Sequence, residues 1–413
     1  MIDSGDTSWI LISTALVLLM TPGLAFFYGG LVGSKNVNAT IMQSFICLGV
    51  VGVVWVLWGY SLAFGTDVGG FVGDLGYFGL RNVGFDEAFP GTGIPHLLFM
   101  AFQMMFAVIT PALVTGAFAG RMKFCSFIVF VVAWVTIVYA PLAHWVWGGG
   151  WMATELQAAD FAGGTVVHIN AGIAAVAAAL IIGKRRNTSS SEPHNVPFVV
   201  LGAALLWFGW FGFNAGSALS SGGGAANAFV TTNSAAAMAA LTWVGLSWFH
   251  TGKASVVGAA VGAVAGLVAI TPAAGFVGLW PATDGFLNAF PALIIGAMSS
   301  VLGFYTIRLL SRFRSFDDTL DVFAVHGVGG MWGALATGIF AVAAVGGVAG
   351  LIEGEGGQLW RQVVAILATV GWTFVMTSVI LLAIKYTMGL VVTEEAEEEG
   401  LDLAEHGETA YIA

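Results

Sequence analysis

The chain consists largely of apolar stretches that are each long enough to cross a lipid bilayer, and this feature restricts its fold more than any other. A membrane-spanning helix needs on the order of 20 apolar residues. Of the 413 residues, 58% are hydrophobic and only 9% are charged, whereas soluble domains carry about 25% charged residues. The apolar stretches begin near Trp9, Ala39, Pro95, Phe124, Phe161, Pro197, Ala228, Ser255, Phe286, Val322 and Gln362. The sequence therefore predicts an all-α integral membrane protein with eleven transmembrane helices.

The positions of the basic residues predict how the chain is oriented. Loops rich in Lys and Arg stay on the cytoplasmic side of a membrane. Loops after odd-numbered stretches, together with the C-terminal flank, contain eleven of the thirteen basic residues, and only Arg81 and Arg361 follow even-numbered stretches. We therefore expect the N-terminus outside the cell and the C-terminus inside. Residues 1–8 lack the basic region and the cleavage site of a signal peptide, so no cleaved signal is expected.

Two regions are expected along the chain. Residues 1–386 form a transmembrane domain, and residues 387–413 form an acidic cytoplasmic tail that contains the run EEAEEE. Such a run is usually a solvated face, and a tail that docks a partner is the alternative. The net charge of −10 argues against binding of nucleic acid. The external loop of residues 65–93 is expected to cap a vestibule.

Two histidines, His168 and His326, lie in the middle of apolar stretches. Ionisable side chains at bilayer depth are costly and are rarely found without a partner or a pathway. His168 belongs to the fifth stretch and His326 to the tenth, so each closes a block of five. Because five is odd, the second block enters the membrane from the opposite side, which is typical of an inverted-topology repeat. We therefore expect the two histidines to share one site near the middle of the membrane, at the contact between two five-helix halves.

The depth of the first histidine agrees with a central site. Asp160 precedes His168 by eight residues, which is about 12 Å along a helix, and the hydrocarbon core is about 30 Å thick. A buried histidine is commonly a packing residue, and two membrane histidines can also hold haem. Cys47 and Cys125 lie in or beside apolar stretches, so neither a disulfide nor a metal cluster is expected.

Six segments then carry a resemblance to a known family. They are residues 21–30 (TPGLAFFYGG), 140–150 (APLAHWVWGGG), 160–168 (DFAGGTVVH), 209–217 (GWFGFNAGS), 265–275 (AGLVAITPAAG) and 321–327 (DVFAVHG). In this order and spacing the chain resembles the ammonium transporter family, with its Amt, Mep and Rh proteins, along essentially its whole length. The resemblance implies a homotrimer in the plasma membrane. Each subunit would enclose its own pore between the two halves, with an eleventh helix along the outside.

The resemblance also implies roles for individual residues. The implied ammonium-binding residues of an outer recruitment site are Phe102, Phe106, Trp147 and Ser217. Two stacked rings, Phe106 and Phe213, match a gate below that site, and His168 and His326 match the pair that lines the pore. The residues that match structural neighbours of the site are Asp160, Trp210, Asn214 and Thr271.

For two of these residues the amino-acid type leaves other roles open. Asp160 matches a buried carboxylate that maintains the architecture of the site, but an aspartate in this position is also suited to cap a helix N-terminus or to bind the cation directly. The Ser217 hydroxyl can instead bond a carbonyl of its own helix.

The function implied by the resemblance is transport of ammonium or ammonia, without enzymatic activity and without a cofactor. A cation over aromatic rings is stabilised by roughly 0.5 to 2 kcal/mol, but an intact cation in an apolar bore meets the cost of buried charge. Deprotonation at the gate would pass ammonia and reject potassium, which has no proton to release. An ammonium sensor that signals through its cytoplasmic face and a neutral-gas channel are the alternatives.

A trimeric PII-type regulatory protein is a further partner that the resemblance suggests at the cytoplasmic face. Three positions there depart from the family pattern, namely Gly33, Gly120 and Val391. Family members usually carry Glu in place of Gly120, directly before Arg121, so one cytoplasmic ion pair is expected to be missing. These departures leave the conduction pathway intact and the docking of the tail open.

Overall fold

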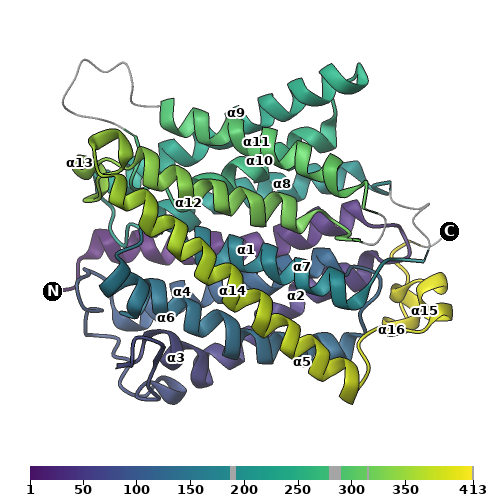
Figure 1. Cartoon of the computed structure of the whole chain (residues 1–413). Helices are drawn as coiled ribbons and strands as arrows, with labels where there is room; N and C mark the ends of the chain where they lie inside the picture. Colours follow the sequence, from purple (N-terminus) through teal and green to yellow (C-terminus); the bar gives the residue numbers. More distant parts are fainter. Residues whose placement is uncertain (187–191, 279–289, 314–315, 412–413) are drawn as a thin grey trace.

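The computed structural model describes residues 1–186, 192–278, 290–313 and 316–411. Long helices run across the whole molecule, with the chain's beginning at one end of the bundle and its tail at the other (Figure 1). The predicted mostly helical fold is thus confirmed. Two positions used in the sequence predictions, Phe286 and Arg314, lie outside the described residues.

The first half of the chain forms five helical passages. They are α1 (Ser4–Leu31), α2 (Val37–Val54) with α3 (Tyr60–Phe64), α4 (His96–Val114), α5 (Phe124–Trp134) with α6 (Ala140–Trp147), and α7 (Asn170–Ile182). Four π-helical turns continue or interrupt them, at Trp55–Gly59, Val135–Tyr139, Met152–Leu156 and Gly164–Ile169. Between α3 and α4 lie a short antiparallel hairpin of β1 (Asp67–Val68) and β2 (Val72–Gly73) and a 3-10 turn, Phe78–Leu80; a second 3-10 turn, Thr115–Ala117, ends α4.

The second half repeats this pattern of long helices. It comprises α8 (Val196–Trp210), α9 (Gly223–Thr251), α10 (Val256–Ile270), α11 (Phe290–Leu310) and α12 (Gly329–Phe340), with π-helical turns at Phe211–Ala215 and Phe323–Val328. The short α13 (Ala343–Gly346) and a 3-10 turn, Leu351–Glu353, lead to α14 (Gly356–Thr387). The tail contains α15 (Glu394–Glu399) and α16 (Leu401–His406).

Ten helical passages among the described residues are long and apolar enough to cross a membrane. The eighth predicted span, α10, is also apolar but has only 15 residues. It ends at Ile270, two residues before Pro272, which lacks the backbone N–H that a continuing helix would need. The multi-pass arrangement is therefore confirmed, while eleven complete spans and the predicted orientation of the termini stay predictions.

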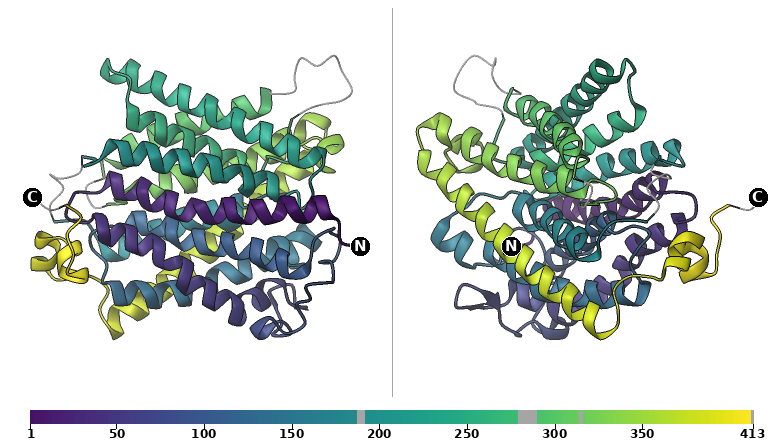
Figure 2. Two further views of the ribbon diagram at one scale, coloured as in Figure 1. Left: turned by 180° about the vertical axis from the view of Figure 1, so that it is seen from behind. Right: turned by 45° about the vertical axis from the view of Figure 1, so that its right-hand side comes forward.

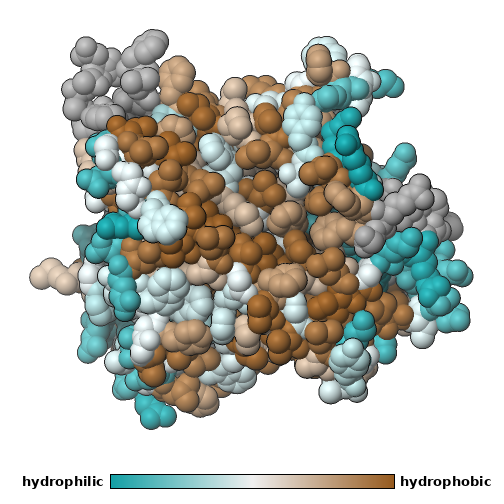
Figure 3. Space-filling view, in the orientation of Figure 1, coloured by the Kyte–Doolittle hydropathy of each residue, from teal (hydrophilic) through white to brown (hydrophobic). Residues whose placement is uncertain are grey.

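The molecular surface agrees with a membrane setting. Hydrophobic residues cover the middle of the face in Figure 3, and hydrophilic residues gather toward the two ends. Exposed aliphatic side chains include Leu241, Leu367 and Val375. Helices suit this setting because they satisfy their backbone hydrogen bonds internally, without water.

The two halves meet along their first and last helices. α1 packs lengthwise on α8, and the π-helical turn Gly164–Ile169 touches the turn Phe323–Val328. α7 also contacts the turn Phe323–Val328, and this contact depends on glycine, since a Cβ on Gly172 of α7 would lie 2.2 Å from the backbone N of Gly327. α14 crosses diagonally over α7 and α12 in Figure 1.

The tail is docked rather than fully solvated. α15 stays largely at the surface, but Leu401 and Asp402 of α16 are buried. The Asp402 carboxylate accepts a hydrogen bond from the backbone N–H of Ala39 at 2.9 Å, and Glu405 accepts one from Phe124 at 2.8 Å. α16 thus caps the starts of α2 and α5, at the end opposite the N-terminus (Figure 2). We call these the tail end and the N-terminal end of the bundle.

Candidate functional site

A line of aromatic and imidazole rings leads from the N-terminal end into the middle of the bundle. The ring centroids of Trp147 and Phe106 are 6.0 Å apart, those of Phe106 and Phe213 are 4.3 Å apart, and those of Phe213 and His168 are 6.0 Å apart. His326 follows at 5.4 Å from His168. The rings come from α4, α6 and three π-helical turns, so residues far apart in sequence form one continuous path.

The other two residues of the predicted recruitment site lie at the part of this path nearest the N-terminal end. Phe102 packs edge-on against Phe106 at 4.9 Å. The Ser217 hydroxyl donates to the carbonyl of Phe213 at 2.7 Å, as the local alternative predicted. Since that bond uses only its proton, the lone pairs of Ser217 stay available to accept an N–H. Phe106 and Phe213 are inclined by 41°, so the predicted stacked gate is tilted rather than parallel.

The two histidines meet in the core, as expected. Their Nδ1 atoms are 3.3 Å apart, and their side chains are 1% and 3% exposed. Two neutral imidazoles form such a contact when one Nδ1 carries a proton and donates a hydrogen bond to the unprotonated Nδ1 of the other. The Nε2 atom of His168 is buried with no protein partner. The pair can therefore offer both a donor and an acceptor to a small polar molecule.

A narrow cavity of about 10 Å³ lies beside the pair. It is lined by Met20, Leu24, Phe27, Ile109, Leu113, Val167, His168, Leu206, Trp210, Phe213, Val264 and His326. This volume is at the lower limit for holding a single water molecule. Apart from the two imidazoles and the indole, its walls are aliphatic, phenyl or, at Met20, a thioether, so the slot suits one small molecule and disfavours a cation.

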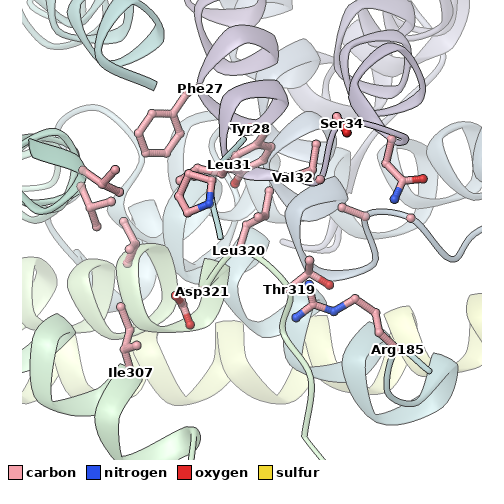
Figure 4. Close-up of a pocket in the computed structure, with 18 of the residues that line it drawn as sticks. Phe27, Tyr28, Leu31, Val32, Ser34, Arg185, Ile307, Thr319, Leu320 and Asp321 are labelled. Atoms are coloured by element: carbon pink, nitrogen blue, oxygen red, sulfur yellow. The ribbon is translucent and has the colours of Figure 1, made fainter. Parts of the chain in front are cut away.

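A larger cavity of about 520 Å³ opens from His326 toward the tail end. It shares Phe27, Val264 and His326 with the narrow slot. Asp321, Thr319 and Arg185 line it together with Phe27 and Leu31 (Figure 4). His326 thus lies between the slot and a vestibule that reaches Glu397 and Glu398 of the tail.

Asp160 acts as a helix cap in the described structure. Its carboxylate accepts hydrogen bonds from the backbone N–H of Gly163 at 2.8 Å, and from those of Gly164 and Thr165 at 2.7 Å each. It also accepts one from the Thr165 hydroxyl. Gly163 has φ of +115°, which favours glycine. The histidine-bearing helix therefore begins at Gly164, later than the predicted Phe161, so Asp160 and His168 do not lie on one continuous helix.

The three remaining predicted neighbours are buried beside the path. The Trp210 indole N–H donates to Thr271 Oγ1 at 2.9 Å, and its ring lies 5.4 Å from that of His168. The Asn214 amide donates to Thr232 at 2.9 Å. These bonds hold the slot-lining ring of Trp210 and the π-helical turn that bears Phe213.

The haem alternative does not fit this geometry. The facing Nδ1 atoms are 3.3 Å apart, which leaves no space for an iron porphyrin ligated from both sides. Among the residues that the structure describes, no group of three or more His, Cys, Asp or Glu side chains is placed to hold a metal ion.

Sequence reasoning missed two groups near the path. Asp321 faces the inner vestibule; its presence five residues before His326 was the available signal. The second group joins Arg121 to Asp317, whose carboxylate also pairs with Arg185 at 2.8 Å. Arg121 lacks the family's preceding Glu, and here its ion pair is made with Asp317 at 3.3 Å. No short-range pattern connects these residues, because they are far apart in the chain.

Comparison with known proteins identifies relatives of the chain. The family model described as "Ammonium Transporter Family" matches residues 8–411. An ammonium transporter of Bacillus subtilis is 48% identical over 98% of this chain and 98% of its own length. The crystal structure of Candida albicans Mep2 is similar with a TM-score of 0.87 and 36% identity, covering 95% of this chain and 87% of that one. A structure described as a sensor Amt protein has a TM-score of 0.87 and 30% identity, covering 97% of this chain and 98% of that one.

Proposed function

The chain belongs to the ammonium transporter family, and from this membership we propose how it moves its substrate. Ammonium is recruited at the N-terminal end between Phe102, Phe106, Trp147 and Ser217. It gives up its proton at the tilted pair Phe106 and Phe213, and ammonia passes His168 and His326 into the inner vestibule. The imidazole pair relays the released proton to the same vestibule, where it recombines with ammonia, so that one charge crosses with each ammonium. The observation that carries this proposal is the continuous line of rings that ends at a slot of about 10 Å³.

Recruitment rests on charge and on one hydrogen bond. The indole of Trp147 and the ring of Phe106 meet edge to face at 80°, so a cation between them contacts a negative π face. Ser217, whose own proton is engaged with Phe213, accepts an N–H from the same ion. These contacts replace part of the water that ammonium loses on leaving the solution.

Passage requires loss of the proton. The slot is bounded mainly by aliphatic and phenyl groups, and an unpaired charge there meets a large desolvation cost. Ammonia avoids this cost and finds a donor and an acceptor in the imidazole pair. Potassium has the charge but no proton to release, and it is therefore excluded.

The same proposal includes the setting of the protein. The N-terminal end faces the outside and the tail end faces the cytoplasm of the cell, in agreement with the eleven-to-two division of basic residues. The protein is placed in the plasma membrane as a homotrimer with one pore per subunit. The docked tail offers a PII-type regulator a surface beside the vestibule.

The likeness to a sensor Amt protein favours sensing as the second candidate function. A sensor that does not transport would bind ammonium but move neither charge nor ammonia. A neutral-gas channel would move ammonia without charge. Recordings that follow current and internal pH together separate all three.

The test uses purified protein in proteoliposomes on a solid-supported membrane, with ammonium and potassium jumps at fixed pH and a pH dye inside the vesicles. Wild-type protein should respond to ammonium and not to potassium. His168→Ala and His326→Ala should change the rate or the potassium exclusion while the protein remains folded by gel filtration. His250→Ala, at the tail end of α9, is the matched control. Wild-type rate and selectivity in either pore variant would remove the pair from the pathway.

A further inference from the structure

The end of α6, which carries Trp147, is held by the hairpin of residues 67–73. His144 Nε2 lies 2.9 Å from Asp67 Oδ1, the Trp145 indole donates to the carbonyl of Phe71 at 2.8 Å, and the backbone N–H of Trp151 donates to Gly70 at 3.1 Å. The hairpin therefore does more than cover the N-terminal end. It binds the residues on both sides of Trp147.

His144 is the buried member of this contact. Its side chain is fully buried, and both ring nitrogens are occupied. Nδ1 lies 2.9 Å from the carbonyl oxygen of Ala63 at the end of α3. Since a carbonyl oxygen only accepts, Nδ1 must carry a proton.

Asp67 determines the state of the other nitrogen. Its side chain is 43% exposed, and its two oxygens accept the backbone N–H of Gly70 at 2.9 and 3.0 Å. The hydrogen bond with His144 and then that with Gly70 lower the pKa of Asp67 below its usual value. The ionised carboxylate only accepts, so Nε2 of His144 must also donate. A histidine with both nitrogens protonated is an imidazolium.

The connection from this pair to Trp147 is direct. Gly148 follows Trp147, and a Cβ on it would lie 1.9 Å from the Ala63 oxygen and 2.7 Å from His144 Nδ1. The turn after Trp147 is thus packed onto the His144–Ala63 hydrogen bond. On the other side, the Trp147 indole N–H donates to the Asp160 carbonyl at 3.0 Å.

We infer that His144 and Asp67 form a fixed imidazolium–carboxylate pair, and that this pair positions Trp147 for recruitment of ammonium. The inference rests on the proposed function of the outer aromatic site. Neither residue touches the substrate in this assignment. They hold the last turn of α6, and hence the indole, in the orientation that faces Phe106.

The balance of charge explains why a cation site tolerates an imidazolium three residues away. The carboxylate of Asp67 neutralises the ring, so ammonium meets no net positive charge. The other acidic side chains of the neighbouring elements bond groups other than His144. Asp74 accepts N–H groups of Thr66 and Gly76, and Asp160 caps the helix of His168. Glu155 is exposed on the π-helical turn after α6.

The first measurement is the ¹⁵N spectrum of histidine-labelled full-length protein in lipid at pH 7.5, with His144→Gln used only to assign the signal. Wild-type protein should show His144 with both nitrogens protonated. Asp67→Asn should retain a hydrogen bond, because the amide can donate to Nε2, but with a neutral ring. A neutral His144 in the wild-type protein overturns the inference without touching the proposed function.

The second measurement is ammonium flux in proteoliposomes. Asp67→Ala should raise the half-saturation concentration several-fold with maximal flux retained, whereas Asp67→Asn should stay closer to wild type. Asp86→Ala, which removes an exposed carboxylate of the same loop, should have no such effect. If Trp147→Leu changes half-saturation and Asp67→Ala does not, positioning by the pair is wrong. If neither variant changes it, the outer site itself is wrong.

Discussion

The aromatic residues of the path differ in how far they are exposed at the N-terminal end. Phe102, Phe106 and Phe213 are almost fully buried, whereas Trp147 is partly exposed at the N-terminal end. In the proposed mechanism, Trp147 is therefore the ring that an incoming cation meets while it still keeps part of its water. Phe213, packed between Phe106 and His168, would contact a molecule only after the cation site.

Trp147→Leu tests the electrostatic part of recruitment. Leucine retains much of the apolar volume but removes the π face, so the apparent affinity for ammonium should fall by roughly 0.5 to 2 kcal/mol, about two- to thirty-fold. The measurement is the dependence of flux on ammonium concentration in proteoliposomes at fixed pH. An unchanged half-saturation concentration with folded protein would contradict the assignment.

Asp321 gives a prediction about pH. Burial, followed by the charge of Asp318, raises the pKa of Asp321 to about 7, above the value near 3.9 of an unfolded aspartate. At pH values between these two pKa values, Asp321 is protonated in the folded state and ionised in the unfolded state. Its contribution to the free energy of unfolding therefore falls as the pH rises from about 4 to 7.

Asp321→Asn removes that dependence. The variant should melt at a higher temperature than wild type at pH 8, by on the order of a few degrees, and the difference should shrink at pH 5. Thermal unfolding in detergent at the two pH values measures it, with Glu408→Ala at the exposed end of the tail as the control. An equal difference at both pH values would show that the carboxyl is not the cause.

At the scale of elements, the apolar stretches predict the helices well because length and hydrophobicity are local properties. They do not predict the π-helical turns at Gly164–Ile169, Phe211–Ala215 and Phe323–Val328. A π-helical turn forms when each backbone N–H donates to a carbonyl five residues earlier, and tertiary packing decides whether this happens. Such turns are frequent at functional sites. All three contain a residue of the ring path. The residues of the path and the meeting of the two histidines were therefore predictable from the sequence, but the π-helical turns that carry them and the tilt between Phe106 and Phe213 were not.

α14, which crosses over α7 and α12, also forms hydrogen bonds with residues beside the site. Gln362 is 1% exposed, and its amide accepts from Ala159 N–H at 2.8 Å and donates to Ala159 O at 2.7 Å. A third bond reaches the carbonyl of Ala334 in α12 at 3.1 Å. One side chain thus connects the residue before Asp160 with the helix that follows His326.

Gln362→Met should weaken both connections. Methionine has a similar length but leaves buried backbone groups of Ala159 unpaired, at a cost of about 1 to 3 kcal/mol for each group. We expect lower thermal stability and lower maximal flux. Thr369→Val is the matched control, since the Thr369 hydroxyl donates to Ala365 within the same helix. Equal effects of the two substitutions would mean that α14 contributes only packing.

At the scale of the whole molecule, the tail connects distant parts of one face. α16 caps α2 through Asp402 and α5 through Glu405, and Arg186 at the end of the first half pairs with Glu394 of α15. The acidic run of α15 stays largely at the surface, as its charge predicts, whereas the docking of α16 onto the starts of α2 and α5 could not be predicted, because these contacts join residues far apart in the sequence. Orientation and trimer formation concern the membrane and other subunits, and they stay predictions.

The double variant Asp402→Ala, Glu405→Ala should release α16. Loss of a helix N-cap costs about 0.5 to 2 kcal/mol, so hydrogen exchange of residues 401–406 should become faster while α1 and α8 keep their protection. Asp402→Asn, Glu405→Gln retains oxygen acceptors and should exchange more slowly than the alanine pair. Unchanged exchange in the alanine pair would mean that other contacts hold the tail.

The size of the slot beside the histidines has a consequence for competition. Ammonia and water are nearly alike in size, so a space of about 10 Å³ cannot sieve one from the other. In the proposed mechanism, a molecule that occupies the slot delays the next one, and turnover is limited by how long each occupant stays. Discrimination between ammonia and water must then come from how long each stays in the slot. In this mechanism the rate of ammonia passage depends on how quickly water leaves the slot as well as on how quickly ammonia does.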